Sequence, residues 1–222
     1  MRWLHVSDHT LYDQRFSAAE RAAKARLWAV LCSDFLQRYV APADSVLDLG
    51  AGFCEFINHI QCAAKLAVDA DEHVRTHAGA GVAIHVGPAH DLAWLEAGKV
   101  DVVFASNLFE HMPNKDVLLA ALREVHRVLK PGGRLLIVQP NIRYAYREYW
   151  DFLDHHVALS HVSMVEALAV CGFSAREVRP RFLPYTTKSR LPMWPVLVRI
   201  YLRCRPLQWL FGKQMFIAAV RR

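Results

Sequence analysis

The residues best suited to chemistry begin at a short acidic segment that ends in a glycine turn. Asp48 precedes the turn, Gly50 and Gly52 form it, and Glu55 follows it. Glycine lets a ligand approach the backbone where a β-carbon would collide, and the next helix offers N–H groups. A dinucleotide site would have the spacing GxGxxG, but Glu55 occupies the place of the third glycine.

The acids beside the turn argue against a phosphate ligand. Two unit charges about 4 Å apart interact by roughly 1 kcal/mol in water and about 4 kcal/mol at an effective dielectric constant of 20. Asp48 and Glu55 would therefore repel a pyrophosphate, whereas they suit the ammonium and sulfonium of S-adenosylmethionine. Asp69 lies about twenty residues beyond the turn, where a carboxylate can accept both ribose hydroxyls. Asp71 is a nearby competitor, and either acid could instead cap a helix.

A second group of candidates contains histidines. His111 follows an expected fourth strand, and His155 and His156 come after the fifth. A neutral imidazole near pH 7 can take the proton of a hydroxyl acceptor, although each histidine could equally be structural. Glu110 is interpreted as a helix acid, and no HxxxH or HxH spacing supports a metal site. Three aromatic candidates for the wall of an acceptor site, which could equally be core residues, are Tyr144, Tyr149 and Trp150.

Alternating apolar runs and helix-compatible segments would position these residues at strand ends. This alternation argues for a parallel sheet. Strands are expected at residues 45–49, 66–69, 82–86, 100–105, 134–138, 173–178 and 214–220. Helices are expected from Ser17 to about Tyr39, over 55–64, over 115–129 before the stop Lys130-Pro131-Gly132-Gly133, and from Ser163 to Gly172.

The stretch of residues 181–213 is too long for a hairpin between two neighbouring strands. It contains an apolar helix candidate over 196–205 with Arg199 and Arg203 on one face. A basic amphipathic helix can lie on a membrane surface or meet a lipid-linked substrate, but it can also form a lid or a dimer face. The flanking aromatic residues are Trp194, Trp209 and Phe211.

Composition narrows the class of protein further. The chain has 222 residues, 54% of them hydrophobic, which is enough for one domain with a sizeable core. No signal peptide or membrane span is predicted, so the expected location is cytoplasmic. Five scattered cysteines suggest neither disulfides nor zinc. The net charge of +6 comes without a nucleic-acid motif, so no nucleic-acid partner is predicted; an anionic small acceptor or lipid headgroup fits the charge.

Four segments together resemble class I S-adenosylmethionine-dependent methyltransferases, particularly the methyltransferase type 11 group. They are Val46-Leu47-Asp48-Leu49-Gly50-Ala51-Gly52, Ala67-Val68-Asp69, and the stretches 100–111 and 122–133. The resemblance implies an α/β fold, namely a Rossmann-like three-layer sandwich with a seven-stranded, mostly parallel sheet whose last strand is antiparallel.

The resemblance also implies roles for residues at the strand ends. The backbone of Gly50 and Ala51 would contact the methionine part of the cofactor, Asp69 the ribose, and Asn107 the floor beneath the amino acid. Cys54 stands where the family usually has a third glycine, and Pro88 where it often has an acid. The complete set expected to bind the cofactor is Asp48, Gly50, Ala51, Gly52, Asp69, Ala70, Ala89, His90 and Asn107.

The sequence thus predicts S-adenosylmethionine-dependent methyl transfer to a small molecule, with glycan- or lipid-linked acceptors included. The expected acceptor atom is oxygen, with His111, His155 or His156 as base. The alternatives are a non-catalytic cofactor-binding relative, and another transfer or a cyclisation that uses the same cofactor. The expected organisation is one domain over 1–222, with an N-terminal helical lid over about 1–40 and the insertion over about 181–213; an oligomer is not excluded. The lid would include Tyr12, Arg15 and Phe16.

Overall fold

The computed structural model describes residues 18–185 and 194–222, so Tyr12, Arg15, Phe16 and Ser17 lie outside the described residues. Seven strands form one sheet in the order β3-β2-β1-β4-β5-β7-β6. β7 is antiparallel to both of its neighbours, and all other pairings are parallel. The predicted sheet is therefore confirmed. The strands are β1 Ser45–Leu49, β2 Ala64–Asp69, β3 Val82–Val86, β4 Val100–Ser106, β5 Leu129–Pro140, β6 Phe173–Arg179 and β7 Gln214–Arg221.

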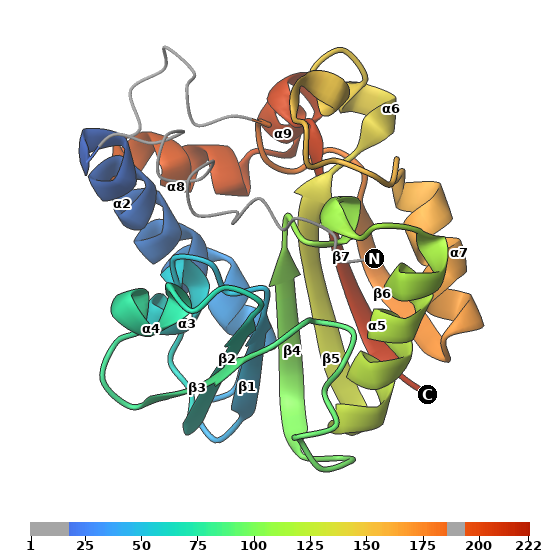
Figure 1. Ribbon diagram of the computed structural model, residues 1–222. Coiled ribbons are helices and arrows are strands. Elements are labelled where there is room, and N and C mark those ends of the chain that lie inside the picture. The colour runs from blue at the N-terminus through green and yellow to red at the C-terminus, as the bar shows by residue number, and fades with distance from the viewer. Residues whose placement is uncertain (1–17, 186–193) are drawn as a thin grey trace.

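Helices cover both faces of this sheet and make three layers, with α5 and α7 on one face and α2, α3 and α8 on the other (Figure 1). The α-helices are α2 Ala18–Asp34, α3 Glu55–His59, α4 Val74–His77, α5 Lys115–Val128, α6 Ile142–Ala145, α7 His161–Val170, α8 Pro195–Arg203 and α9 Arg205–Phe211. Three 3-10 helices complete the described chain: η1 Leu36–Tyr39, η2 Phe109–His111 and η3 Tyr149–Asp151.

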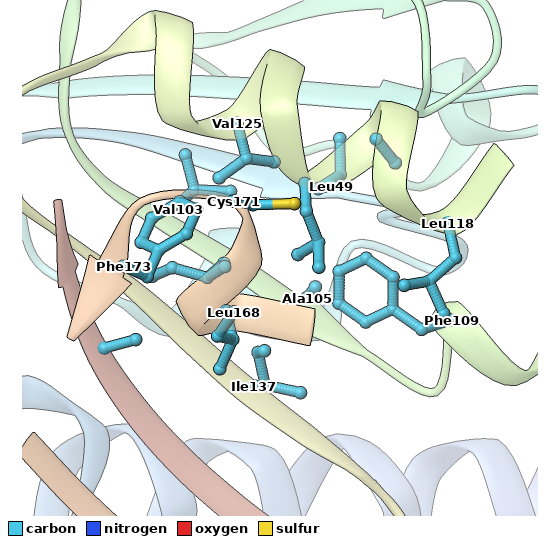
Figure 2. Packing of buried hydrophobic residues seen from close by; sticks show 14 of the residues in the cluster. Leu49, Val103, Ala105, Phe109, Leu118, Val125, Ile137, Leu168, Cys171 and Phe173 are labelled. Atoms are coloured by element: carbon cyan, nitrogen blue, oxygen red, sulfur yellow. The ribbon is translucent and has the colours of Figure 1, made fainter. Parts of the chain in front are cut away.

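The apolar strands are buried on both faces because side chains alternate across a strand. In β4, Val102 and Phe104 pack toward α2 and α3, whereas Val103 and Ala105 pack toward α5 and α7. Figure 2 shows the second of these layers, where Val103 and Ala105 lie with Leu118 of α5 and Leu168 of α7. Two tightly packed layers fix the carboxyl ends of β1 and β4, from which the candidate residues project.

Three expected helix boundaries are wrong. The first helix breaks after Asp34, and residues 36–39 form η1 instead. The helix after the glycine turn ends at His59, because Ile60 is extended and the chain turns directly into β2. Helix α7 starts earlier than predicted: Ser160 caps it, and the Ser160 and Ser163 side chains each accept from the other's backbone N–H. A capping box has the same three-residue spacing at either serine, so spacing could not choose between them.

The strand that follows α5 also begins earlier than expected, at Leu129 instead of 134. A register shift between Val100 and Val102 in β4 accommodates the Lys130-Pro131-Gly132-Gly133 segment, and Gly132 has a φ of +75°. The Lys130-Pro131-Gly132-Gly133 segment therefore follows the end of the helix as predicted, but it already belongs to strand β5, which pairs with β4.

The described part of the insertion, residues 181–185 and 194–213, contains two helices. The predicted helix is α8, and the sequence reasoning missed α9, which begins with Pro206 in its first turn. α8 lies beside α2 (Figure 1), where Arg199 pairs with Asp34 at 3.3 Å. The Tyr201 hydroxyl donates to the Phe182 carbonyl at 2.6 Å and holds the helix to the sheet edge. Among the described residues, no helix has the length and apolar character needed to cross a bilayer.

Candidate cofactor pocket and histidine cluster

The glycine turn is fixed against the end of β2 by its own N–H groups. Gly50 and Ala51 donate to the Val68 carbonyl at 2.9 and 3.1 Å, and Gly52 donates to Asp69 Oδ2 at 2.8 Å. Gly50 has a φ of +71°, and a β-carbon there would lie 2.7 Å from Leu108 Cδ1. All three donors are thus committed to protein acceptors, so the turn does not present the free N–H cradle that a phosphate requires.

Three acids surround the turn. Asp48 is buried, and this burial raises its pKa well above the ordinary value; the charges of Glu55 and Asp69 raise it further, against a lowering hydrogen bond from the Ile57 backbone. Glu55 pairs with Lys24 of α2 at 3.0 Å. A cationic ligand beside the turn would stabilise the ionised form of Asp48, which burial and the two neighbouring acids disfavour.

A cavity of about 380 Å³ opens between the turn and the helices above it. Most of its lining is apolar, with a few polar groups at the sheet edge, as in a typical small-molecule site. Its floor includes Phe104, which stacks on Phe56 at 3.9 Å. The sequence reasoning missed the helical walls, because they arise only when α8 packs on α2. Those walls include Trp28 and Leu31 of α2, Leu197 and Ile200 of α8, and Leu207 and Phe211 of α9.

The predicted cofactor residues fall into two groups. Asp48, Gly50, Ala51, Gly52 and Asn107 line the cavity, and Asn107 has a φ of +48°. The others lie outside the lining, at the ends of β2 and β3. The Gly87 N–H donates to the Asp69 carbonyl at 2.8 Å and so attaches the β3 loop to β2. The members of this second group are Asp69, Ala70, Ala89 and His90.

The structure brings together two of the three candidate histidines. The rings of His111 and His155 stand edge to face with their centroids 4.9 Å apart. His156 is exposed, and its backbone N–H donates to the Glu110 carbonyl at 2.8 Å. None of the three lines the described cavity.

Tyr185, which the sequence reasoning did not single out, connects this cluster to the cavity. It lines the cavity, and its ring centroid lies 5.7 Å from that of Phe152, which stacks on His155 at 5.2 Å. Burial raises the Tyr185 pKa, and the nearby charge of Glu110 raises it further. The cluster therefore lies behind one wall of the cavity.

Glu110 and His111 have contrasting surroundings. Glu110 is 1% exposed, and neither of its carboxyl oxygens has a hydrogen-bond partner among the described residues. Burial raises its pKa to about 6, opposed by His111. His111 Nδ1 lies 3.0 Å from the Asp154 carbonyl oxygen and 3.4 Å from Asp154 Oδ2. A carbonyl only accepts, so Nδ1 carries the proton and Nε2 keeps a lone pair.

Glu110→Gln is expected to remove a pH-dependent loss of stability. Raising the carboxyl pKa from 4.5 to about 6 makes ionisation in the folded state cost about 2 kcal/mol. The wild type carries no such cost below the unfolded pKa, and loses this stability as pH rises through the folded pKa. We therefore expect the variant to gain about 2 kcal/mol over wild type between about pH 4 and pH 7.5. Urea unfolding at both pH values, with chelator present, measures the free energy of unfolding of the variant and of wild type. A difference between the two proteins that does not change with pH contradicts the prediction.

The three aromatic residues predicted to wall an acceptor site lie outside the lining of the described cavity. Tyr149 is fully buried, and its hydroxyl donates to the Val157 carbonyl at 2.7 Å and accepts from the Leu159 N–H at 3.2 Å. A side chain so enclosed and satisfied belongs to the core. Tyr144 lies beside the Arg181 guanidinium at 4.9 Å, and Trp150 is 56% exposed. Neither of these two lines the described cavity.

The chain is similar in sequence to known methyltransferases. A family model described as "Methyltransferase domain" matches residues 47–137. Demethylmenaquinone methyltransferase of Symbiobacterium thermophilum is 28% identical over 80% of this chain and 72% of its own length. A probable methyltransferase of Aspergillus luteorubrus is 30% identical over 56% of this chain and 50% of its own length, so this chain spans only half of that relative.

Solved structures share the fold at low sequence identity. An S-adenosylmethionine-dependent methyltransferase from Archaeoglobus fulgidus matches with a TM-score of 0.67 and 20% identity, over 96% of this chain and 99% of that one. A complex between the Haloferax volcanii Trm112 methyltransferase activator and a methyltransferase also matches with a TM-score of 0.67, at 19% identity over 92% and 94%. The topology of this sheet is therefore shared by proteins of very different sequence.

Proposed function

We propose that this chain, which belongs to the class I S-adenosylmethionine-dependent methyltransferases, methylates a hydroxyl oxygen of a small acceptor with an apolar body. The enzyme class and the cofactor follow from the family; the acceptor, its oxygen and the site residues are proposed. One observation carries the proposal: a single cavity joins the acidic glycine turn to apolar walls from α2, α8 and α9.

The residues around the turn fit the cofactor. The Gly50 and Ala51 backbone would flank its methionine part, and Asp48 would face its positive charges. The Asp69 carboxylate already accepts from Gly52 and Asp71 N–H groups at 2.8 and 3.0 Å, which holds it at the edge where the ribose would lie. When bound, the cofactor supplies an electrophilic methyl group on a sulfonium.

The acceptor would enter between α2 and the insertion. Leu197, Ile200 and Phe211 line the cavity, yet are 43%, 52% and 46% exposed, so the apolar wall continues onto the surface. The Arg203 and Arg205 side chains nearby in the sequence are 80% and 63% exposed. We therefore favour a lipid-linked acceptor over a glycan-linked one, with the insertion and α2 as its lid.

The reaction is an in-line displacement at the methyl carbon. The new oxygen–carbon bond forms as the carbon–sulfur bond breaks, and the sulfonium charge disappears, which an apolar cavity favours. The acceptor proton would pass to Nε2 of His111, whose ring Asp154 orients. His111 lies four residues after the cavity residue Asn107. A general base within reach of the acceptor hydroxyl typically contributes about 10²–10⁴-fold.

Methyl-labelled cofactor tests the proposal. The protein is incubated with label and with lipid extracts or aqueous extracts. Reduced demethylmenaquinone, whose quinol form carries two hydroxyls, serves as one defined acceptor because the S. thermophilum relative carries that name. Mass spectrometry of the product locates the methyl group, and label on a ring carbon would refute the oxygen acceptor. We expect labelled product in the organic phase, and none with heat-inactivated protein. Cofactor binding by calorimetry without transfer to any extract would support a non-catalytic relative, and label confined to water-soluble product would refute the lipid-linked acceptor.

A further inference from the structure

We propose that Glu110, His111 and His155 form a binding site for one divalent transition-metal cation. The ligand atoms that these three side chains offer all lie within 4.8 Å of one another. One carboxylate and two imidazoles suit zinc, manganese, iron and cobalt. Metal–ligand bonds of about 2.0–2.2 Å place tetrahedral ligand atoms about 3.3 Å apart. Side-chain rotations that move each ligand atom by about 1 Å would therefore bring the three atoms to coordination distance of one ion.

The burial of Glu110 is the independent observation that points to a cation. Its side chain is 1% exposed, and both oxygens lack a hydrogen-bond partner within the part of the chain that the structure describes. Buried carboxylates are otherwise paired, hydrogen-bonded, neutralised or bound to metals, because an isolated buried charge is costly. A divalent cation would supply the positive partner that a buried, ionised Glu110 requires.

The surroundings of His111 match those of a metal ligand. Nδ1 donates to the Asp154 carbonyl, with Asp154 Oδ2 at 3.4 Å, which leaves Nε2 to coordinate. Metal-bound histidines usually donate their other ring N–H to a carboxylate or a carbonyl, and this fixes the tautomer. The donor set is thus present together with a group that fixes the tautomer of His111.

The backbone holds the third ligand in place. The Glu110 carbonyl accepts from His156 N–H at 2.8 Å and from Val157 N–H at 3.1 Å. These two bonds fasten the segment that carries His155 directly against η2, which carries Glu110 and His111. The site is therefore assembled by the fold before any ion arrives.

The inference rests on the proposed function only for its chemical role. Three protein ligands leave a coordination position open, and the cluster lies behind the cavity residue Tyr185. An ion there would occupy the lone pair of His111, so the imidazole could not also take a proton. The ion would instead acidify a bound acceptor hydroxyl, whose proton would pass to a solvent water molecule. Binding of the ion itself requires neither acceptor nor cofactor.

Cobalt titration of chelator-treated, dialysed full-length protein tests the site. Visible spectra report coordination, and charge-transfer bands in the near ultraviolet report thiolate ligands. We expect one Co²⁺ per chain without thiolate bands. Loss of an outer-shell partner typically lowers metal affinity about 10- to 100-fold, so loss of a direct ligand in Glu110→Gln or His111→Gln should lower it by at least that much. His156→Gln, next in sequence to His155 but outside the cluster, is the matched control and keeps the wild-type affinity.

Three results would overturn the inference: no stoichiometric binding, thiolate bands, or unchanged affinity in folded Glu110→Gln. Thermal unfolding of each variant without metal checks that it folds. The methyl-transfer assay is independent, because a chain that binds Co²⁺ but transfers no label refutes the proposed function alone.

Discussion

Asp69→Ala is expected to weaken S-adenosylmethionine binding about 100-fold. A hydrogen bond to a charged group contributes about 1.5–3 kcal/mol, so losing the two hydrogen bonds that we propose between Asp69 and the ribose hydroxyls costs about 3 kcal/mol or more. The substitution also removes the oxygen that accepts from the Gly52 N–H at 2.8 Å, which loosens the glycine turn. Isothermal titration calorimetry with the cofactor alone measures the effect.

Asp71→Ala is the matched control, because it removes an acid two residues away. Asp71 Oδ1 accepts from the His73 N–H at 2.8 Å and stabilises the following turn. We expect this variant to bind the cofactor within about threefold of wild type, a difference below 1 kcal/mol. If Asp71→Ala lost as much affinity as Asp69→Ala, the ribose contact would have to be reassigned to Asp71.

His111→Gln is expected to lower kcat about 10²- to 10³-fold, within the range for loss of a general base. Glutamine keeps a polar amide near Asp154 but has no imidazole lone pair. Since His111 lies outside the cavity lining, cofactor affinity should stay within about threefold of wild type. Single-turnover rates of methyl transfer with saturating labelled cofactor measure the effect. The protein is treated with chelator, so that the rates report the contribution of the imidazole without a bound metal.

A kcat within about threefold of wild type would remove His111 as the base. His126→Gln provides the comparison for the general cost of changing a histidine, since the His126 ring packs on Phe173 at 5.3 Å, between α5 and β6. A parallel loss in His126→Gln would assign the effect to packing instead of to proton transfer.

The sheet could be predicted because its strands are short apolar runs with clear ends. The bounds 45–49 and 82–86 agree with β1 and β3, and the helix before Lys130 ends within one residue of its expected position. The helix after the turn was predicted too long, because residues 60–63 carry no Gly or Pro to mark the end at His59. The local sequence pattern predicts the end of an element less well where the tertiary path of the chain determines that end.

The candidate site was less predictable, because its walls come from distant segments. The glycine turn and Asn107 could be located from strand ends, whereas the α8 and α9 walls depend on packing against α2. Glu110 was interpreted as a helix acid and does lie in the 3-10 helix η2, but its burial beneath the segment containing His156 and Val157 could not be predicted from local sequence. Tyr149 could not be assigned either, since its buried hydroxyl is satisfied by two backbone groups that follow it in a loop.

The N–H groups of the glycine turn already donate to protein acceptors, and this limits how the site could be redesigned for another ligand. Glu55→Gly would restore the GxGxxG spacing and remove one repelling charge. The Gly50, Ala51 and Gly52 N–H groups would still donate to Val68 and Asp69. A phosphate would have to break those bonds before it could use the turn. Strand β2 thus restricts which ligands could take the place of S-adenosylmethionine. A redesign of the site for nucleotides would have to begin at the carboxyl end of β2.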